Sequence, residues 1–287
     1  MNKQPIKIIE CPRDAMQGYS THFSTNQKVE YVQKLLSVGF DILDCASFVS
    51  PKAIPQMADS SEVIKALDLS KTNTQLLAIV ANIRGAQDAV LHDKISFLGY
   101  PFSISETFQK RNTNKTIEES LNELEEIMRI ANASSKSTVV YLSMGFGNPY
   151  GEDWSIDLVE HWVEKLIAIG TTCISLSDTV GTAKLKDLTE IFNTLIVKYP
   201  KIEFGAHLHC KPYEWNEKIE AAYNGGCRRF DGALRGFGGC PMAANNLTGN
   251  MPTEGIVSYF KSQLSAQFSY TNFDDALLAA DKLFLSN

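Results

Sequence analysis

The chain lacks the features that mark nucleic-acid-binding and membrane proteins. It has no excess of positive charge, since 27 lysines and arginines stand against 33 aspartates and glutamates and the formal net charge is −6. This balance argues against general binding to nucleic acid or to anionic membrane surfaces. No apolar stretch is long enough to span a bilayer, and residues 1–7 contain no apolar core of a signal peptide. We therefore expect a cytoplasmic protein with no nucleic-acid partner and no membrane partner.

Linkers and paired cysteine motifs are also missing. There is no Ser/Gly-rich tract, no long charge run and no low-complexity segment, so nothing divides the 287 residues into separate domains. The six cysteines show no C-x-x-C spacing, which argues against a structural zinc knuckle. In a reducing compartment they are expected to be free thiols.

Eight short, β-rich apolar runs alternate with longer helical patterns along the chain. The runs span residues 6–10, 41–45, 76–80, 94–97, 138–143, 173–177, 202–206 and 229–231, and the last is short and weak. The clearest helical patterns span 27–38, 117–132 and 156–169. Eight β-then-helix units predict an α/β fold, a single (β/α)8 TIM barrel forming one domain over residues 1–287. A doubly wound open sheet is the alternative, but no glycine-rich nucleotide loop follows the first run.

Two histidines separated by one residue, His207 and His209, close the seventh run. Side chains two apart on a strand project to the same face, so both imidazoles would point to one place, where they could share a divalent cation. An isolated pair of this kind is equally compatible with two polar residues on a wet strand face. Other polar residues favour a site, because barrel enzymes place catalysis at the carboxyl ends of strands. Those at matching strand ends are Arg13, Asp14, Asp44, Asp178 and, in a glycine-rich loop after the eighth run, Cys240.

Taken together, several stretches resemble the 3-hydroxy-3-methylglutaryl-CoA lyase family, within a wider group of metal-dependent barrel lyases and aldol-type synthases. The stretches are IIECPRDAMQ (8–17), ASFVSPK (46–52) with PQMAD (55–59), SETF (105–108) with IEES (117–120), ISLSDTVG (174–181) and GFGGCP (236–241). The similarity extends from Ile6 to about Tyr259. SFVSPK and GGCP are specific to the lyase branch, whereas the Arg13-Asp14 pair and the H-x-H are shared more widely.

The resemblance implies a divalent metal ion, Mg²⁺ or Mn²⁺, held by Asp14, His207, His209 and Asn250. Oxygen and imidazole ligands suit these cations. Asn250 aligns with the family only if the loop carries a one-residue insertion, and Asn246 is the alternative ligand.

The resemblance also implies a retro-Claisen cleavage of an acyl-CoA substrate, 3-hydroxy-3-methylglutaryl-CoA, to acetyl-CoA and acetoacetate. Arg13 would stabilise the thioester enolate, and Cys240 would transfer a proton from a closing loop. Asp178 would support the site or orient the hydroxyl, with capping of the next helix as the alternative. Candidates for binding the CoA phosphates are Lys52, Arg84, Lys110 and Arg111, for which solvated surface cations are the default interpretation.

Three positions depart from the family pattern and leave other functions open. Asp44 stands where the family usually has glutamate, Cys210 replaces an acidic residue, and Cys11 replaces a glycine-containing turn. A metal-dependent aldolase acting on a hydroxy-oxo acid, or a lyase for a different 3-hydroxyacyl-CoA, is one alternative. A catalytically silent relative that binds a metabolite or a protein is another. Barrels of this kind often self-associate, so a homo-oligomer is a further expectation.

Overall fold

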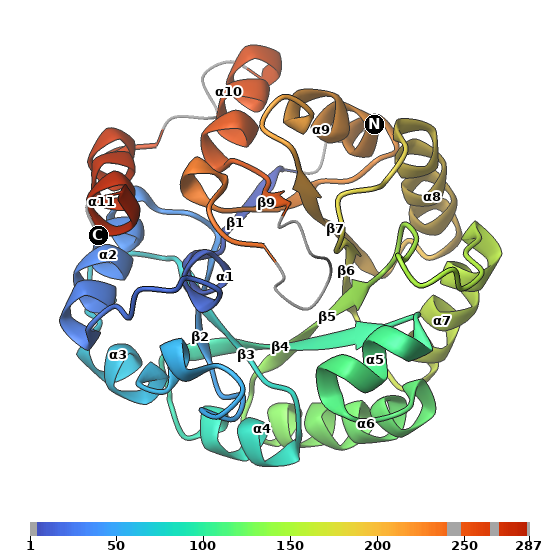
Figure 1. Ribbon diagram of the computed structural model, residues 1–287, viewed down its shortest axis with the longest axis horizontal. Helices are drawn as coiled ribbons and strands as arrows, with labels where there is room; N and C mark the ends of the chain where they lie inside the picture. Colours follow the sequence, from blue (N-terminus) through green and yellow to red (C-terminus); the bar gives the residue numbers. More distant parts are fainter. Residues whose placement is uncertain (1–4, 240–247, 265–269, 286–287) are drawn as a thin grey trace.

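The computed structural model describes residues 5–239, 248–264 and 270–285, in which a closed barrel of parallel strands is surrounded by helices (Figure 1). Each strand pairs in parallel with the next, and the last returns to the first. The barrel strands are β1 (Lys7–Glu10), β2 (Ile42–Ser47), β3 (Gln75–Ile79), β4 (Ile95–Ser103), β5 (Ser137–Ser143), β6 (Cys173–Asp178), β7 (Glu203–Cys210) and β8 (Arg229–Gly232). The prediction of a (β/α)8 TIM barrel is confirmed.

Helices follow the strands and form the outer ring of the barrel (Figure 1). They are α1 (Pro12–Gln17), α2 (Thr25–Val38), α3 (Ser60–Ala66), α4 (Ile83–Val90), α5 (Glu106–Thr113), α6 (Ile117–Ala133), α7 (Ile156–Ala168), α8 (Leu185–Lys198), α9 (Trp215–Asn224), α10 (Thr253–Leu264) and α11 (Phe273–Leu285). The three helices predicted most clearly are α2, α6 and α7. Thr116 and Glu119 form a capping box at the start of α6, because each side chain bonds the other residue's backbone N–H. Within the described ranges no helix combines the length and the apolar character needed to cross a bilayer.

The strand β7 is longer than predicted, and this places both histidines inside the sheet. Its pairing with β6 ends where Asp178 lies opposite Leu208. A short ninth strand, β9 (Gly249–Asn250), then pairs antiparallel with the end of β7, with Asn250 opposite His209. The extra pairing partner explains why β7 continues to Cys210 instead of ending near Ala206. His207 and His209 therefore lie on one strand face, as their spacing predicts.

The inside of the barrel carries charge as well as apolar side chains. An apolar cluster inside the barrel includes Ile9, Leu77 and Val139 and is separate from the larger core between the strands and the helices. Arg229 and Asp231 of β8 are 1 % and 2 % exposed. Gly205 makes room for the arginine, since a Cβ atom at this position would lie 2.8 Å from Cδ of Arg229. The interior beneath the strand ends therefore contains a buried charged pair.

We expect the thermal stability to fall between pH 5 and pH 8 because of Glu10. Burial raises the pKa of this carboxyl group from 4.5 to about 8, although Thr253 and the backbone N–H of Leu234 donate hydrogen bonds to it. The folded state thus keeps a proton that the unfolded chain has released, so stability decreases as the pH rises through this window. In Glu10→Gln the difference in Tm between pH 5 and pH 8 should shrink by about 2 °C or more, as followed by circular dichroism.

Glu125→Gln is the control for this experiment, because Glu125 lies on the exposed face of α6. This variant should keep the slope of the unchanged protein. An equal slope in Glu10→Gln would mean that the folded protein does not hold the proton on Glu10.

Candidate active site

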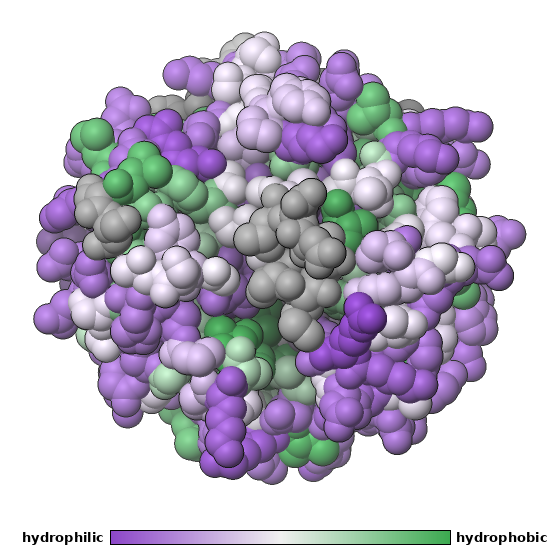
Figure 2. All heavy atoms as spheres, viewed as in Figure 1, coloured by the Kyte–Doolittle hydropathy of each residue, from purple (hydrophilic) through white to green (hydrophobic). Residues whose placement is uncertain are grey.

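The polar residues predicted from the strand ends meet in one cavity at the mouth of the barrel. The cavity has a volume of about 140 Å³, and Arg13, Asp14, His207 and His209 line it. Apolar side chains such as Ile79 and Phe108 and polar ones such as Ser143 complete the lining. Figure 2 shows a hollow near the centre of this face with apolar side chains at its bottom. The arrangement can hold a charged group of a substrate within a lining that is partly polar and partly apolar.

Three of the predicted metal ligands form a compact group. Ligand atoms of Asp14, on α1, and of His207 and His209, on β7, all lie within 4.8 Å of one another. Asn250 joins them from β9, and its Nδ2 donates to Asp14 Oδ2 at 2.7 Å. Its amide can turn by 180°, so that either the oxygen or the nitrogen faces the group. A carboxylate, two imidazoles and an amide form a donor set that fits a divalent cation.

The surroundings hold two of the ligands, Asp14 and His209, in the protonation states that metal binding needs. Burial raises the pKa of Asp14, but the charges of Arg13 and of the two histidines outweigh it and lower the pKa to about 2. Burial and the neighbouring His207 lower the pKa of His209, whose Nδ1 lies 3.3 Å from the carbonyl oxygen of Thr248. Asp14 is therefore an anion and His209 a neutral imidazole near pH 7.

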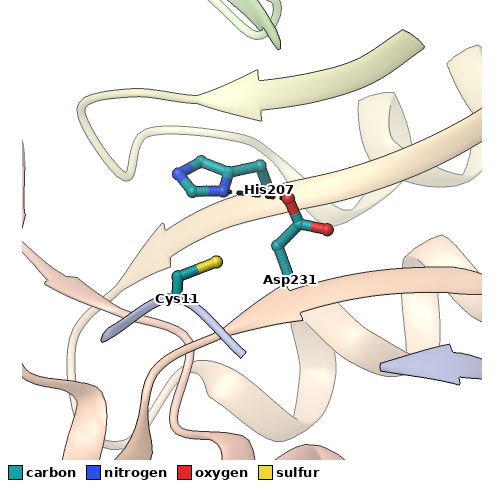
Figure 3. A group of neighbouring side chains, drawn as sticks. All are labelled: Cys11, His207 and Asp231. Atoms are coloured by element: carbon teal, nitrogen blue, oxygen red, sulfur yellow. Dashed lines mark hydrogen bonds and ion pairs between the residues drawn. The ribbon is translucent and has the colours of Figure 1, made fainter. Parts of the chain in front are cut away.

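His207 has a carboxylate partner of its own. Its Nδ1 lies 3.2 Å from Oδ2 of Asp231, on the neighbouring strand β8, and Figure 3 shows Cys11 close to the same pair. Burial lowers the pKa of His207, but the hydrogen bond and the charge of Asp231 outweigh this effect and raise it. The contact follows from strand register, because His207 and Asp231 lie opposite each other in the sheet.

Arg13 is fixed between two carboxylates. Its Nε lies 3.1 Å from both oxygens of Asp44, Nη2 also donates to Asp44, and Nη1 donates to Asp14 Oδ1 at 2.9 Å. Burial lowers the pKa of the guanidinium, but the two carboxylates raise it further than burial lowers it, so Arg13 stays charged. Since a guanidinium has five N–H donors, each terminal nitrogen keeps one for a ligand. Asp44 thus holds Arg13 in place, and Asp14 joins the arginine to the metal-ligand group.

Asp178 lies beneath the site, where it binds a buried lysine. Its Oδ2 accepts a hydrogen bond from Lys218 Nζ at 2.8 Å, and its carboxylate also accepts from the backbone N–H groups of Thr182 and Ala183. Lys218 in turn donates to the carbonyl oxygen of His209 at 2.9 Å. The helix α8 begins after Lys184 without a side-chain cap, so Asp178 does not cap it. The contact with Lys218 is compatible with the supporting role, and both this role and orientation of a substrate hydroxyl stay predictions.

Other predicted residues lie elsewhere. Cys240 and Asn246 fall outside the described residues. The four candidate cations for CoA follow β2, β3 and β4, and three of them already have partners. Arg84 Nε lies 4.0 Å from a carboxylate oxygen of Asp88. Lys110 Nζ lies 3.1 Å from a carboxylate oxygen of Glu106, and the guanidinium of Arg111 lies 4.8 Å from the ring centre of Tyr150. All four stay candidates.

Three residues of the site were missed in the sequence. Asp231 and Lys218 are described above, and Gln17 donates to Asp14 Oδ1 at 2.7 Å. Lys218 carried a signal, since it lies three residues after Trp215 and four before Ala222, on the helix face that is expected to be buried. Asp231 carried none beyond its place in the eighth run, because its contact depends on the register between two strands.

Gly238 brings the chain close to the metal-ligand group, and alanine at this position should weaken metal binding. Its φ is +94°, and a Cβ atom there would lie 2.6 Å from the carbonyl oxygen of Asp14 and 2.7 Å from Nδ2 of Asn250. We expect Gly238→Ala to lower the affinity for Mn²⁺ by about 10-fold or more, because displacement by 1 Å is enough for such losses. Titration with Mn²⁺, followed by electron paramagnetic resonance (EPR) of the free ion, measures the change.

Gly39→Ala is the matched control. Gly39 has a φ of +87°, but no atom lies within 4 Å of its Cβ position. This variant carries the same backbone strain and should bind Mn²⁺ as the unchanged protein does. Equal affinities in all three proteins would show that the approach of Gly238 does not position the ligands.

The chain is similar to known proteins of one family. The HMGL-like family model matches residues 6–277. The hydroxymethylglutaryl-CoA lyase YngG of Bacillus subtilis is 33% identical over 246 residues, which cover 86% of this chain and 81% of that protein. The mitochondrial hydroxymethylglutaryl-CoA lyase of Bos taurus is 31% identical over 255 residues, or 88% of this chain and 77% of that protein.

Solved structures of similar proteins have the same fold. An HMG-CoA lyase from Acinetobacter baumannii, in complex with coenzyme A and 3-methylmalate, superposes with a TM-score of 0.88 at 29% identity, covering 99% of this chain and 91% of that one. The HMG-CoA lyase of Bacillus subtilis also gives a TM-score of 0.88, at 31% identity, covering 98% of this chain and 93% of that one.

Proposed function

The chain belongs to the HMGL-like family, and from this membership and the site we propose that it cleaves 3-hydroxy-3-methylglutaryl-CoA into acetyl-CoA and acetoacetate. It is a carbon–carbon lyase. The observation that carries the proposal is the joining of Arg13 to the metal-ligand group through Asp14, in the cavity at the barrel mouth. The acyl-CoA substrate is supported by the relatives named as HMG-CoA lyases and by the similar structure that holds coenzyme A.

The metal centre would consist of Asp14, His207, His209 and Asn250. A Mg²⁺ or Mn²⁺ ion bound by these residues would act as a Lewis acid towards the tertiary hydroxyl and the carboxylate of the substrate. Asp14 and the neutral His209 offer lone pairs without first losing a proton. Which of the two metals is used belongs to the proposal.

Arg13 would stabilise the charge that develops in the reaction. The hydroxyl proton would pass to water, the alkoxide would become a carbonyl group as the carbon–carbon bond breaks, and the electron pair of that bond would pass to the thioester fragment as an enolate. Arg13 lines the cavity and keeps free N–H donors, so it can bind the enolate oxygen. The enolate carbon then takes up a proton to give acetyl-CoA, and we assign this proton transfer to Cys240.

The departures from the family pattern fit this reaction. Both carboxylate oxygens of Asp44 lie 3.1 Å from Nε of Arg13, although the aspartate side chain is one methylene shorter than that of glutamate. Cys210 is 2% exposed and its Sγ lies 3.9 Å from Sδ of Met251, so this position is used for packing. Cys11 lies inside the barrel, close to His207 and Asp231 (Figure 3). These contacts explain how the arginine and the metal ligands keep their places with altered neighbours.

The test is product formation from 3-hydroxy-3-methylglutaryl-CoA by protein that has been freed of metal. Addition of Mg²⁺ or Mn²⁺ should start the release of acetyl-CoA and acetoacetate in equal amounts. Bound metal without turnover of this substrate, together with cleavage of a hydroxy-oxo acid, would show an aldolase instead. Bound metal and no turnover on a broad panel of CoA esters and hydroxy-oxo acids would show a silent relative.

The proposal also covers the cellular location and the oligomeric state of the protein. We place the protein in the cytoplasm as one catalytic domain, and the curated relatives include both cytoplasmic and mitochondrial lyases. Formation of a homo-oligomer stays a prediction, which sedimentation of the purified protein tests.

A further inference from the structure

Asp231 lies outside the group of proposed metal ligands but contacts one of them, His207. We infer that Asp231 is a positioning residue, whose carboxylate accepts a hydrogen bond from Nδ1–H of His207 and so leaves Nε2 of this ring for the cation. The inference rests on the metal centre of the proposed function. It concerns the orientation of one ligand and adds a residue to the reaction that touches neither substrate nor metal.

The contact itself defines which nitrogen carries the proton. An ionised carboxylate can only accept hydrogen bonds, and a neutral imidazole has one donor nitrogen and one acceptor nitrogen. Because Nδ1 of His207 faces Oδ2 of Asp231 at 3.2 Å, Nδ1 is the donor. In the neutral ring the lone pair is therefore on Nε2, and His207 belongs to the group formed with Asp14 and His209.

Asp231 is itself held in place inside the barrel. It is 2% exposed, Ser175 Oγ lies 3.4 Å from its Oδ2, and Nε of Arg229 lies 3.9 Å from its Oδ1. The guanidinium of Arg229 offsets the charge of the buried carboxylate. A metal-bound histidine usually has such a partner, and loss of the partner lowers metal affinity by about 10- to 100-fold.

A cation bound between Cys11, His207 and Asp231 would compete with the hydrogen bond between His207 and Asp231. The thiol of Cys11, Nδ1 of His207 and the carboxylate of Asp231 all lie within 4.8 Å of one another (Figure 3). A thiophilic cation could in principle bind there. The neighbouring guanidinium of Arg229 argues against it, because a second cation beside Asp231 would be repelled. The hydrogen bond between Asp231 and His207 needs no such cation.

Replacement of Asp231 by asparagine tests the inference through metal binding. An amide can donate as well as accept, so it no longer selects the Nδ1–H form of His207. We expect the Kd for Mn²⁺, measured by EPR of the free ion at constant pH, to rise by about 10- to 100-fold. The Tm of the metal-free protein should fall as well, because the buried guanidinium of Arg229 loses its counter-charge, so circular dichroism first has to show that the variant is folded. Asp41→Asn is the control, since Asp41 accepts a backbone hydrogen bond from Ile8 at the opposite end of the barrel and should leave the Kd unchanged.

A second measurement is made on the unchanged protein and therefore tests the inference even if Asp231→Asn does not fold. Nitrogen-15 NMR of the histidine-labelled protein distinguishes the two neutral forms of each imidazole, and the signals that vanish in His207→Ala assign this residue. We expect the Nδ1–H form of His207 in the unchanged protein. The Nε2–H form would overturn the inference, as would an unchanged Kd in a folded Asp231→Asn.

Two further outcomes separate this inference from the proposed function. If His207→Ala binds Mn²⁺ as tightly as the unchanged protein, the metal centre itself is wrong, and the role of Asp231 is lost with it. If His207→Ala weakens binding and Asp231→Asn does not, only the positioning role is overturned. Co²⁺ tests the competing use: a thiolate-to-cobalt charge-transfer band that disappears in Cys11→Ser would show Cys11 as a ligand and overturn the inference.

Discussion

Arg13→Lys is expected to lower the rate constant for cleavage of 3-hydroxy-3-methylglutaryl-CoA by about 100- to 1,000-fold, the range found when a donor to a developing oxyanion is removed. Arg13 binds Asp44 and Asp14 through different nitrogens and still keeps donors for a ligand. A lysine ammonium is a point charge that cannot bridge both carboxylates and face the substrate as well. Steady-state kinetics at saturating Mn²⁺ should show the loss mainly in kcat.

Lysine is the better replacement because it keeps the charge. Alanine would leave Asp44 and Asp14 buried without their cation, and loss of one partner of a buried pair costs about 3–5 kcal/mol. Arg129→Lys is the matched control, since Arg129 is exposed on α6 and pairs only with Glu126 among the contacts described. Comparable turnover of Arg13→Lys and the unchanged protein would remove Arg13 from the mechanism.

His209→Ala is expected to lower the affinity for Mn²⁺ by more than about 100-fold, beyond the loss typical of residues that only orient a ligand. The side chain faces Asp14 and His207, whereas its backbone carbonyl accepts the hydrogen bond from Lys218. The substitution therefore removes an imidazole and keeps the backbone contact. Cleavage activity should fall with the metal content and recover in part when Mn²⁺ is raised.

The control for this variant is His161→Ala. His161 is exposed on α7, where it packs against Trp162, and its replacement should change neither metal binding nor turnover. If His209→Ala bound Mn²⁺ like the unchanged protein, the pair of histidines would be a structural feature of β7.

The sequence predicts the order of strands and the residues at their ends more closely than it predicts their contacts. Alternation of β-rich runs and helical patterns identifies the barrel, and strand ends locate Arg13, Asp14 and the histidines. The length of β7 could not be predicted, because the strand is extended by pairing with residues about 40 positions later in the chain. Local sequence patterns contain no information on such a partner.

Contacts that depend on register were also beyond prediction. Asp44 was expected at the rim, but its bond to Arg13 is known only once β2 and α1 are placed side by side. Asp231 faces His207 because β8 pairs with β7 in one particular register. Asp178 and Lys218, 40 residues apart, meet for a similar reason. The residue types were visible in the sequence, whereas their partners were not.

The short pairing between β9 and β7 has a consequence for how this protein and its relatives can vary. Asn250 is held by backbone pairing to the strand that carries His209, and Met251 N–H also donates to the carbonyl oxygen of Leu208. The position of Asn250 is thus fixed by its pairing with β7, whatever the number of residues between Gly239 and Asn250. Insertions or deletions between these two points can change the length of the loop while the ligand keeps its register. A chain with one extra residue there, as the alignment of Asn250 requires, can therefore keep this amide beside His209.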